Sequence, residues 1–91
     1  MVEKNLEELF KNSADLIKKE GPNLNLTNDD LLVLYGYYKQ ATVGDCNEPE
    51  PGLFDLRGKA KYTAWKENIG ISKESAMKKY NKKVSKLVEK K

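Results

Sequence analysis

Several residue types that proteins use for metal binding and catalysis are missing or rare in this sequence. There is no histidine, and Cys46 is the only cysteine. A disulfide within the chain is therefore impossible, and neither a cysteine–histidine zinc site nor histidine-based catalysis can be built. We accordingly expect no metal site and no bound cofactor. A single thiol is also typical of a reducing compartment.

Long apolar segments are missing as well. No run approaches the ~20 apolar residues that cross a bilayer. The first ten residues contain three glutamates and lack the apolar core of a signal peptide. The net charge of +3 is too small to indicate nucleic-acid binding by itself. With 91 residues, the chain is expected to form one domain, residues 1–91. We expect it to be in the cytoplasm, since nothing in the sequence points to export. A monomer is the expected state for a domain this small.

What the sequence does contain is helical periodicity, and no segment shows the alternation of a strand. A first helix is predicted to end near Gly21–Pro22, before a loop over Asn23–Asn28. Its apolar stripe consists of Leu6, Leu9, Phe10, Ser13, Leu16 and Ile17. Thr27, with Asp30 three residues later, is predicted to cap a second helix. That helix should close at Gly44–Asp45.

Two further helices are predicted after a long irregular segment, Val43–Leu56, which is rich in glycine and proline. A loop of this length is uncommon in a small domain, and the simplest explanation is a crossover between the ends of a helical bundle. The third helix is expected from about Gly58 to Asn68, with Gly70 as its stop and Ala60, Ala64 and Trp65 facing inward. Ser72 should cap the fourth, whose apolar face is formed by Ala76, Met77, Tyr80, Val84, Leu87 and Val88.

A set of tyrosines and basic residues at helical spacing is the most informative feature. Tyr35 and Lys39 are four residues apart and so lie on one helix face, with Tyr38 beside them. Arg57 and Lys61 repeat this spacing, whereas Lys18 and Tyr80 come from the first and fourth helices. Converging cations and hydroxyl donors suit a phosphate, and aromatic faces suit a purine. A phosphorylated nucleotide is therefore a reasonable ligand class.

Other interpretations of the same residues stay open at this point. The tyrosines can be aromatic residues at the edge of a core, and the lysines can be a solvated face. A basic helical module that docks an acidic protein or nucleic acid would also fit. An enzyme is a third alternative, although no motif places a nucleophile beside a base and no glycine-rich phosphate loop is present.

The run from Leu34 to Asp45, LYGYYKQATVGD, resembles the signature of the acyl-CoA-binding protein family. The similarity continues through Pro51–Gly52, Gly58–Lys59–Ala60–Lys61, Ala64–Trp65, Gly70, Ser72–Lys73–Glu74, Ala76–Met77–Lys78 and Tyr80. It implies an all-α, four-helix bundle with an up-down-down-up course and a long crossover between helices 2 and 3. It also implies a protein that binds medium- to long-chain fatty acyl-CoA without changing it.

The resemblance further implies a role for each matching residue. Tyr35, Lys39 and Lys61 would hold the 3′-phosphate end of the head group. Ala14, Lys18 and Tyr38 would border the adenine, Tyr80 would contact the CoA moiety, and Arg57 takes a position that is often lysine. The expected partner is a long-chain ester such as palmitoyl- or myristoyl-CoA, with no nucleic acid and at most transient membrane contact. The expected role is an intracellular carrier and pool former, not an enzyme, that delivers the ester to enzymes and membranes.

Overall fold

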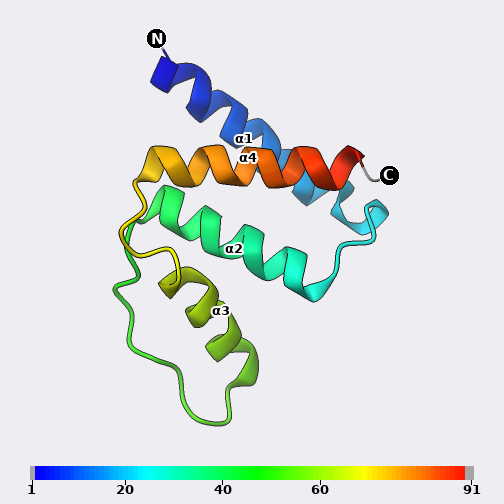
Figure 1. Ribbon diagram of the computed structural model, residues 1–91. Coiled ribbons are helices and arrows are strands. Elements are labelled where there is room, and N and C mark those ends of the chain that lie inside the picture. The colour runs from blue at the N-terminus through cyan, green and yellow to red at the C-terminus, as the bar shows by residue number, and fades with distance from the viewer. Residues whose placement is uncertain (1, 90–91) are drawn as a thin grey trace.

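The computed structural model describes residues 2–89, with side chains from residue 5 onward, as four α-helices joined by loops (Figure 1). The helices are α1 (Val2–Glu20), α2 (Asn28–Thr42), α3 (Leu56–Lys66) and α4 (Lys73–Glu89), and a short 3-10 turn, η1 (Gly21–Asn23), follows α1. Residues 2–89 contain no strand. The all-α, four-helix prediction is therefore confirmed.

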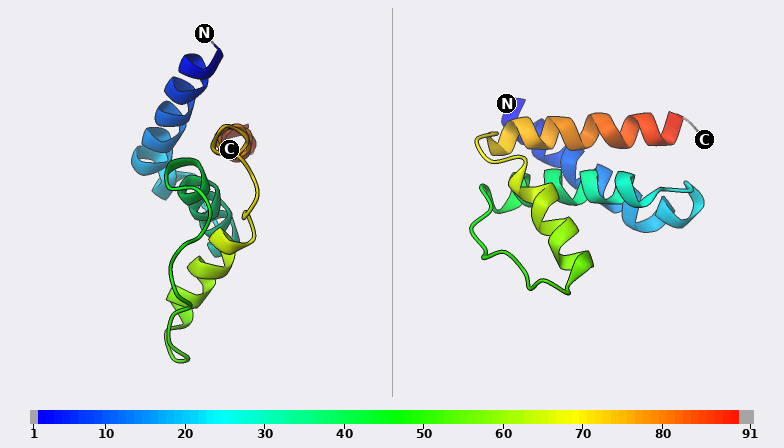
Figure 2. Two further views of the ribbon diagram at one scale, coloured as in Figure 1. Left: turned by 90° about the vertical axis from the view of Figure 1, so that its left-hand side faces the viewer. Right: turned by 60° about the horizontal axis from the view of Figure 1, so that its bottom comes forward.

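The helices follow the predicted up-down-down-up course. In Figure 1, α2 and α3 run in the same direction, and α1 and α4 run against them. The segment 43–55 makes this possible because it carries the chain back along the molecule from the end of α2 to the start of α3. Helix α4 packs against both α1 and α2, whereas α3 packs only against α2 among the described helices (Figure 2). The position of α3 consequently depends on its contacts with α2.

The core lies between α1, α2 and α4. It consists of Phe10, Leu34, Ala41, Ala76, Tyr80, Val84 and Leu87. On α4 the predicted apolar face is buried except for Val88, which is 39% exposed, and Met77, which is half-buried. On α1 the prediction was too broad, because Leu9 is 56% and Leu16 37% exposed. These two positions lie at the edge of a narrow contact strip centred on Leu6 and Phe10.

Caps explain where the helices begin. Thr27 and Asp30 form the predicted capping box, with the Asp30 N–H donating to Thr27 Oγ1 at 3.0 Å and the Thr27 N–H donating to Asp30 Oδ2 at 3.2 Å. At α4 the Ser75 N–H donates to Ser72 Oγ at 3.1 Å, so that prediction is also confirmed. Helix α3 begins at Leu56 and not at Gly58, because Asp55 Oδ1 accepts the Gly58 N–H at 3.0 Å and so caps the helix two residues earlier.

The end of α3 also differs from the prediction. The helix ends at Lys66, and a turn follows before Gly70, which adopts a φ of +96°. Asn68 therefore lies beyond the helix and is buried with 8% of its surface exposed. Its Nδ2 donates to the backbone oxygen of Ala64 at 3.2 Å. Glycine permits the left-handed turn that brings the chain into α4.

Hydrogen bonds join the end of α2 to the connection between α3 and α4. Gln40, only 1% exposed, donates through Nε2 to Asp45 Oδ1 at 2.8 Å and to the Ile71 carbonyl at 2.7 Å. Asp45 Oδ1 also accepts the Gly70 N–H at 3.0 Å. A second link runs from Trp65 Nε1 to the Gly44 carbonyl at 2.8 Å. This network holds the C-terminal end of α3 beside α2.

The Asp45 carboxylate should make stability depend on pH. The Gly70 N–H, and secondly the Gln40 amide, favour the ionised form and lower the pKa of Asp45 from its ordinary 3.8. The unfolded chain therefore holds this proton more tightly, so the stabilisation is complete above pH 3.8 and is lost as the pH falls through the lowered pKa.

We expect Asp45→Asn to lower the melting temperature at neutral pH and to flatten its decline on acidification. Thermal unfolding followed by circular dichroism at pH 7 and at decreasing acidic pH measures both effects. Melting curves of the two proteins that shift in parallel with pH would contradict this assignment.

Candidate functional site

Residues from three helices line a hollow beside the core. Its volume is about 390 Å³, and its walls are formed by Ala14, Asp15, Ile17, Lys18, Leu31, Leu34, Tyr35, Tyr38 and Tyr80. Five of the residues predicted for the site, namely Ala14, Lys18, Tyr35, Tyr38 and Tyr80, are thus brought together. Helix α2 can supply both tyrosines because positions three residues apart lie on one face.

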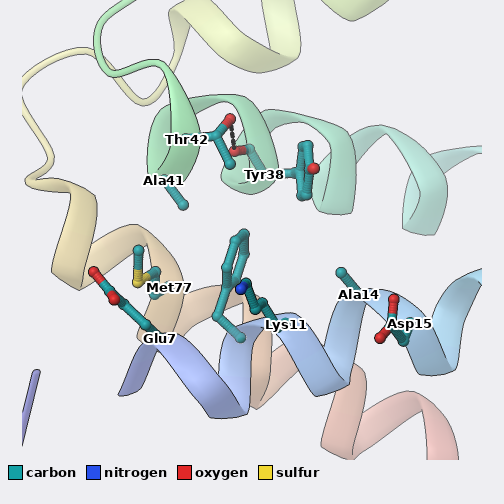
Figure 3. Close-up of a pocket in the computed structure, with 9 residues that line it drawn as sticks. Glu7, Lys11, Ala14, Asp15, Tyr38, Ala41, Thr42 and Met77 are labelled. Carbon is teal, nitrogen blue, oxygen red and sulfur yellow. Dashed lines mark hydrogen bonds between the residues drawn. The ribbon is translucent and has the colours of Figure 1, made fainter. Parts of the chain in front are cut away.

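A larger hollow of about 630 Å³ adjoins the first between α1 and α2. The two share Ala14, Asp15 and Tyr38, and Figure 3 shows Tyr38 on α2 across the space between the helices from Ala14 and Asp15 on α1. The other lining residues are Glu7, Phe10, Lys11, Ala41, Thr42 and Met77. The Thr42 hydroxyl donates to the Tyr38 carbonyl at 2.8 Å (Figure 3). The two hollows form one recess around the Tyr38 ring.

Three aromatic rings form the floor of this recess. Phe10 stacks on Tyr38 with ring centroids 5.6 Å apart, and Tyr80 meets the edge of Phe10 at 5.1 Å. Tyr38 is 42% exposed, so one part of its ring remains available for stacking. Burial, and to a smaller degree Tyr38, raises the pKa of Tyr80 to about 12. The ordinary pKa of 10 already leaves a tyrosine hydroxyl neutral at physiological pH, and the shift moves Tyr80 further from ionisation, so it can donate a hydrogen bond.

Phe10 was predicted only as a core residue, and its place in the recess was missed. The signal was present, because Phe10, Ala14 and Lys18 follow each other at four-residue steps on α1. Ala14 and Lys18 had been assigned through the resemblance and not through this spacing. Extending the Ala14–Lys18 spacing by one helical turn toward the N-terminus would have predicted Phe10 as a residue of the site.

Two lysines connect α2 and α3 next to the recess. The Nζ atom of Lys61, on α3, lies 5.4 Å from the centroid of the Tyr35 ring on α2. In the opposite direction, Lys39 Nζ on α2 lies 4.8 Å from the centroid of the buried Trp65 ring on α3. Such contacts hold ammonium groups over aromatic faces. Tyr35 belongs to both groups, since it lines the hollow and carries Lys61.

Arg57 is the predicted residue that the structure does not bring into this arrangement. It is exposed in the first turn of α3, one turn before Lys61, and lines neither hollow. Within residues 5–89 no acidic side chain forms an ion pair with it. Its predicted position on the same helix face as Lys61 is correct, but its participation in binding stays a prediction.

The chemistry of the recess is that of binding. It offers aromatic faces, hydroxyl donors and nearby ammonium groups, which together suit a purine and a phosphate. In the described part of the chain, no three acidic, cysteine or histidine side chains are placed to hold a metal ion. The same residues include no helix that is long and apolar enough to span a membrane.

Comparisons with known proteins find relatives in sequence and in fold. The sequence profile of the family described as "Acyl CoA binding protein" matches residues 7–84. An acyl-CoA-binding protein of Gossypium hirsutum is 48% identical over 86 residues, covering 92% of each chain. Among solved structures, Acyl-CoA-Binding Protein 2 of Oryza sativa is similar with a TM-score of 0.85 and 42% identity, covering 93% of this chain and 92% of its own.

A second crystal structure, of the acyl-CoA-binding protein of Moniliophthora perniciosa, gives a TM-score of 0.88 at 40% identity. It covers 92% of this chain and 81% of its own. The similarity therefore extends over sequence and fold together, and the match includes both α1 and α4. By its sequence and by its fold, this chain belongs to the acyl-CoA-binding protein family.

Proposed function

We propose that the protein binds medium- to long-chain fatty acyl-CoA esters without chemical conversion, as a monomeric carrier in the cytoplasm whose residues 1–91 form one binding domain. The observation that carries this proposal is that Tyr35, Tyr38 and Lys18 line one recess, while Lys61 of α3 lies over the Tyr35 ring at its edge. Lys39 of α2 lies over the neighbouring Trp65 ring. Family membership and fold support the binding of acyl-CoA. Carriage, pool formation and delivery to enzymes and membranes are the finer parts of the proposal.

The head group is assigned to Tyr35 and to the two lysines that lie over aromatic rings where α2 meets α3. Lys61 and Lys39, together with the Tyr35 hydroxyl, are proposed to hold the 3′-phosphate. An ammonium that rests on an aromatic ring can leave it for a phosphate oxygen, because a charge-assisted hydrogen bond is the stronger contact. The exposed part of the Tyr38 ring is proposed to stack on the adenine.

The remaining proposed contacts surround this pair of subsites. Ala14 contributes a small side chain that leaves room for the adenine, and Lys18 places a further cation at the edge. Tyr80, whose pKa burial raises to about 12, is proposed to donate a hydrogen bond to the CoA moiety. Arg57 is proposed as a peripheral cation that attracts the anionic head group toward α3.

The acyl chain should supply a large part of the affinity. Burial of a methylene group contributes ~0.8 kcal/mol, so about sixteen carbons could contribute roughly 12 kcal/mol at most. Ordering of the flexible chain and the cost of association remove much of that gain. Head-group contacts would then select the ligand class, while the length of the chain would tune affinity.

Titration calorimetry with three ligands tests the proposal. We expect palmitoyl-CoA to bind tightly, and free CoA and free palmitate to bind at least about 100-fold more weakly, because each lacks one of the two contributions. Palmitate bound as tightly as its CoA ester would contradict the head-group assignment. Thioester cleavage by the purified protein would instead indicate an enzyme.

The salt dependence of the same titration separates this proposal from nucleic-acid binding. Contacts with many phosphates weaken steeply as salt rises. Burial of an acyl chain does not. We therefore expect only a modest loss of palmitoyl-CoA affinity in high salt, because only the lysine contacts with the head group should weaken.

A further inference from the structure

Three large apolar side chains are exposed within four consecutive residues where the crossover loop meets α3. Leu53 is 73% exposed, Phe54 92% and Leu56 77%. We call Leu53, Phe54 and Leu56 the apolar tip. Single exposed hydrophobic residues are normal on a protein surface, but a contiguous group usually marks a contact with another body.

The apolar tip is held outward by a defined turn. The Asp55 N–H donates to the Gly52 carbonyl at 3.1 Å, which closes a four-residue turn with Leu53 and Phe54 at its two central positions. Central turn positions project away from the chain and are usually polar. Asp55 also caps α3 through Gly58, so the turn is attached directly to a helix.

The turn lies at an extremity of the molecule. In Figure 1 the last part of the segment 43–55 forms the lower end of the fold, well away from α1 and α4. The turned views in Figure 2 place the same part of the chain at the end of the molecule. The recess between α1 and α2 is therefore separate from the apolar tip, and Leu53 and Phe54 line neither of its hollows.

The charges next to the apolar tip leave a cation available. Lys59 Nζ lies 3.6 Å from Glu50 Oε2, so these two charges offset each other. The Asp55 carboxylate accepts the Gly58 N–H in the first turn of α3. Arg57, adjacent to Leu56 in sequence, is exposed and forms no ion pair within residues 5–89. In a lipid layer the apolar acyl region lies beneath the phosphates. The apolar turn would match the acyl region, and the guanidinium at its base would match the phosphates.

We propose that the apolar tip inserts into the surface of a phospholipid membrane, with Arg57 at the level of the phosphate groups. The inference rests on the proposed function, because a long-chain acyl-CoA is an amphiphile that partitions between water and membranes. A protein that docks beside the ester would shorten its path through water. Insertion of only these three side chains gives reversible binding, as with single lipid anchors, which suits a carrier that must leave the membrane again.

The shape of the apolar tip favours a lipid surface over a protein partner. A specific protein interface buries roughly 1,000 Å² or more, and a projecting group of three side chains offers far less than that. A symmetric contact between two copies of the chain would bring two convex turns together, and neither could enclose the other. A fluid lipid layer adapts to a small wedge without a preformed pocket.

Vesicle flotation tests the inference with Leu53→Ser/Phe54→Ser as the variant. Ile69→Ser is the matched control, because Ile69 is 50% exposed and lies past the opposite end of α3. Each protein is mixed with vesicles of phosphatidylcholine, with or without phosphatidylserine, and palmitoyl-CoA affinity is measured separately by calorimetry without vesicles. We expect the double variant to lose membrane binding by at least about tenfold, since each buried apolar side chain raises partitioning by that order.

The outcomes are distinguishable. The inference holds if wild type and the Ile69 variant float equally, the tip variant remains in solution, and all three bind palmitoyl-CoA within about twofold of one another. It is overturned if the wild type never floats at millimolar lipid, or if the tip variant floats as the wild type does. The inference is also overturned if flotation requires phosphatidylserine and is unchanged in the tip variant, because that result indicates membrane binding through a basic surface elsewhere. Failure of wild type to bind palmitoyl-CoA in the calorimeter contradicts the proposed function instead.

Discussion

Replacing Lys61 with alanine is expected to weaken palmitoyl-CoA binding by about 10- to 100-fold while leaving the fold intact. Lys61 is exposed on α3, and its ammonium rests over the Tyr35 ring with no buried partner left behind by its removal. The variant should therefore be almost as stable as the wild type. In the complex the same group is proposed to donate to the 3′-phosphate, and hydrogen bonds between charged groups contribute about 1.5–3 kcal/mol. Calorimetry and thermal unfolding of the purified variant measure the two effects separately.

Lys66→Ala provides a closely matched control. Lys66 belongs to the same helix, is also exposed, and its Nζ lies 5.6 Å from the centroid of the Tyr62 ring. The control thus removes the same charge and the same kind of aromatic contact, but outside the recess. We expect its affinity for palmitoyl-CoA to remain within about twofold of wild type, given the small effect of remote surface charges. Equal losses in the two variants would mean that net charge, and not a phosphate site, governs binding.

A palmitoyl ester of dephospho-CoA, which lacks the 3′-phosphate, sharpens the assignment. If Lys61 contacts that phosphate, the wild type should lose affinity for this ligand, and Lys61→Ala should lose little more. The two changes then remove one and the same interaction and are non-additive. Additive losses would place Lys61 against another part of the ligand.

The sequence was sufficient for the features that depend on local spacing. Thr27 and Asp30 predicted a capping box because both partners lie within one helical turn. Tyr35 and Tyr38 predicted a shared face for the same reason, and the recess contains both. The crossover was also predictable, since a segment rich in proline and glycine cannot continue α2.

Features that depend on contacts between helices were harder to predict. The predicted start of α3 was too late because Asp55, which lies in a segment with a loop-like sequence, caps the helix. The predicted end was too late because Asn68 lies beyond the helix, where its side chain donates to the Ala64 carbonyl. Leu9 fits the apolar period of α1 but lies outside the strip that α4 covers. Periodicity locates a face and does not say how much of that face a neighbour covers.

The contact between α2 and α3 gives the second large expected effect, a loss of about 2 kcal/mol of stability in Gly36→Ala. A Cβ at residue 36 would lie 2.4 Å from the Ala64 carbonyl oxygen and 2.9 Å from Asn68 Nδ2. The oxygen belongs to the backbone, so no side-chain rotation relieves the clash, and α3 must move. We take the cost as about 3 kcal/mol, offset by ~1 kcal/mol because alanine favours a helix more than glycine does. Denaturant unfolding measures the difference, and Gly52→Ala, which has no atom within 4 Å of the added Cβ, should change stability by less than about 0.5 kcal/mol.

The same substitution should also weaken palmitoyl-CoA binding, although the Gly36 position faces α3 and not the recess. Helix α3 packs against no described helix except α2, so a displaced α3 moves Lys61 away from Tyr35, and the proposed phosphate site loses its geometry. We expect an affinity loss comparable with that of Lys61→Ala, measured where the variant is still folded. A variant that is destabilised yet binds normally would show that the ligand can restore the helix contact, or that Lys61 does not need Tyr35 beside it. Reduced affinity together with reduced stability would mean that the close approach of α2 and α3 builds the phosphate site as well as holding the fold.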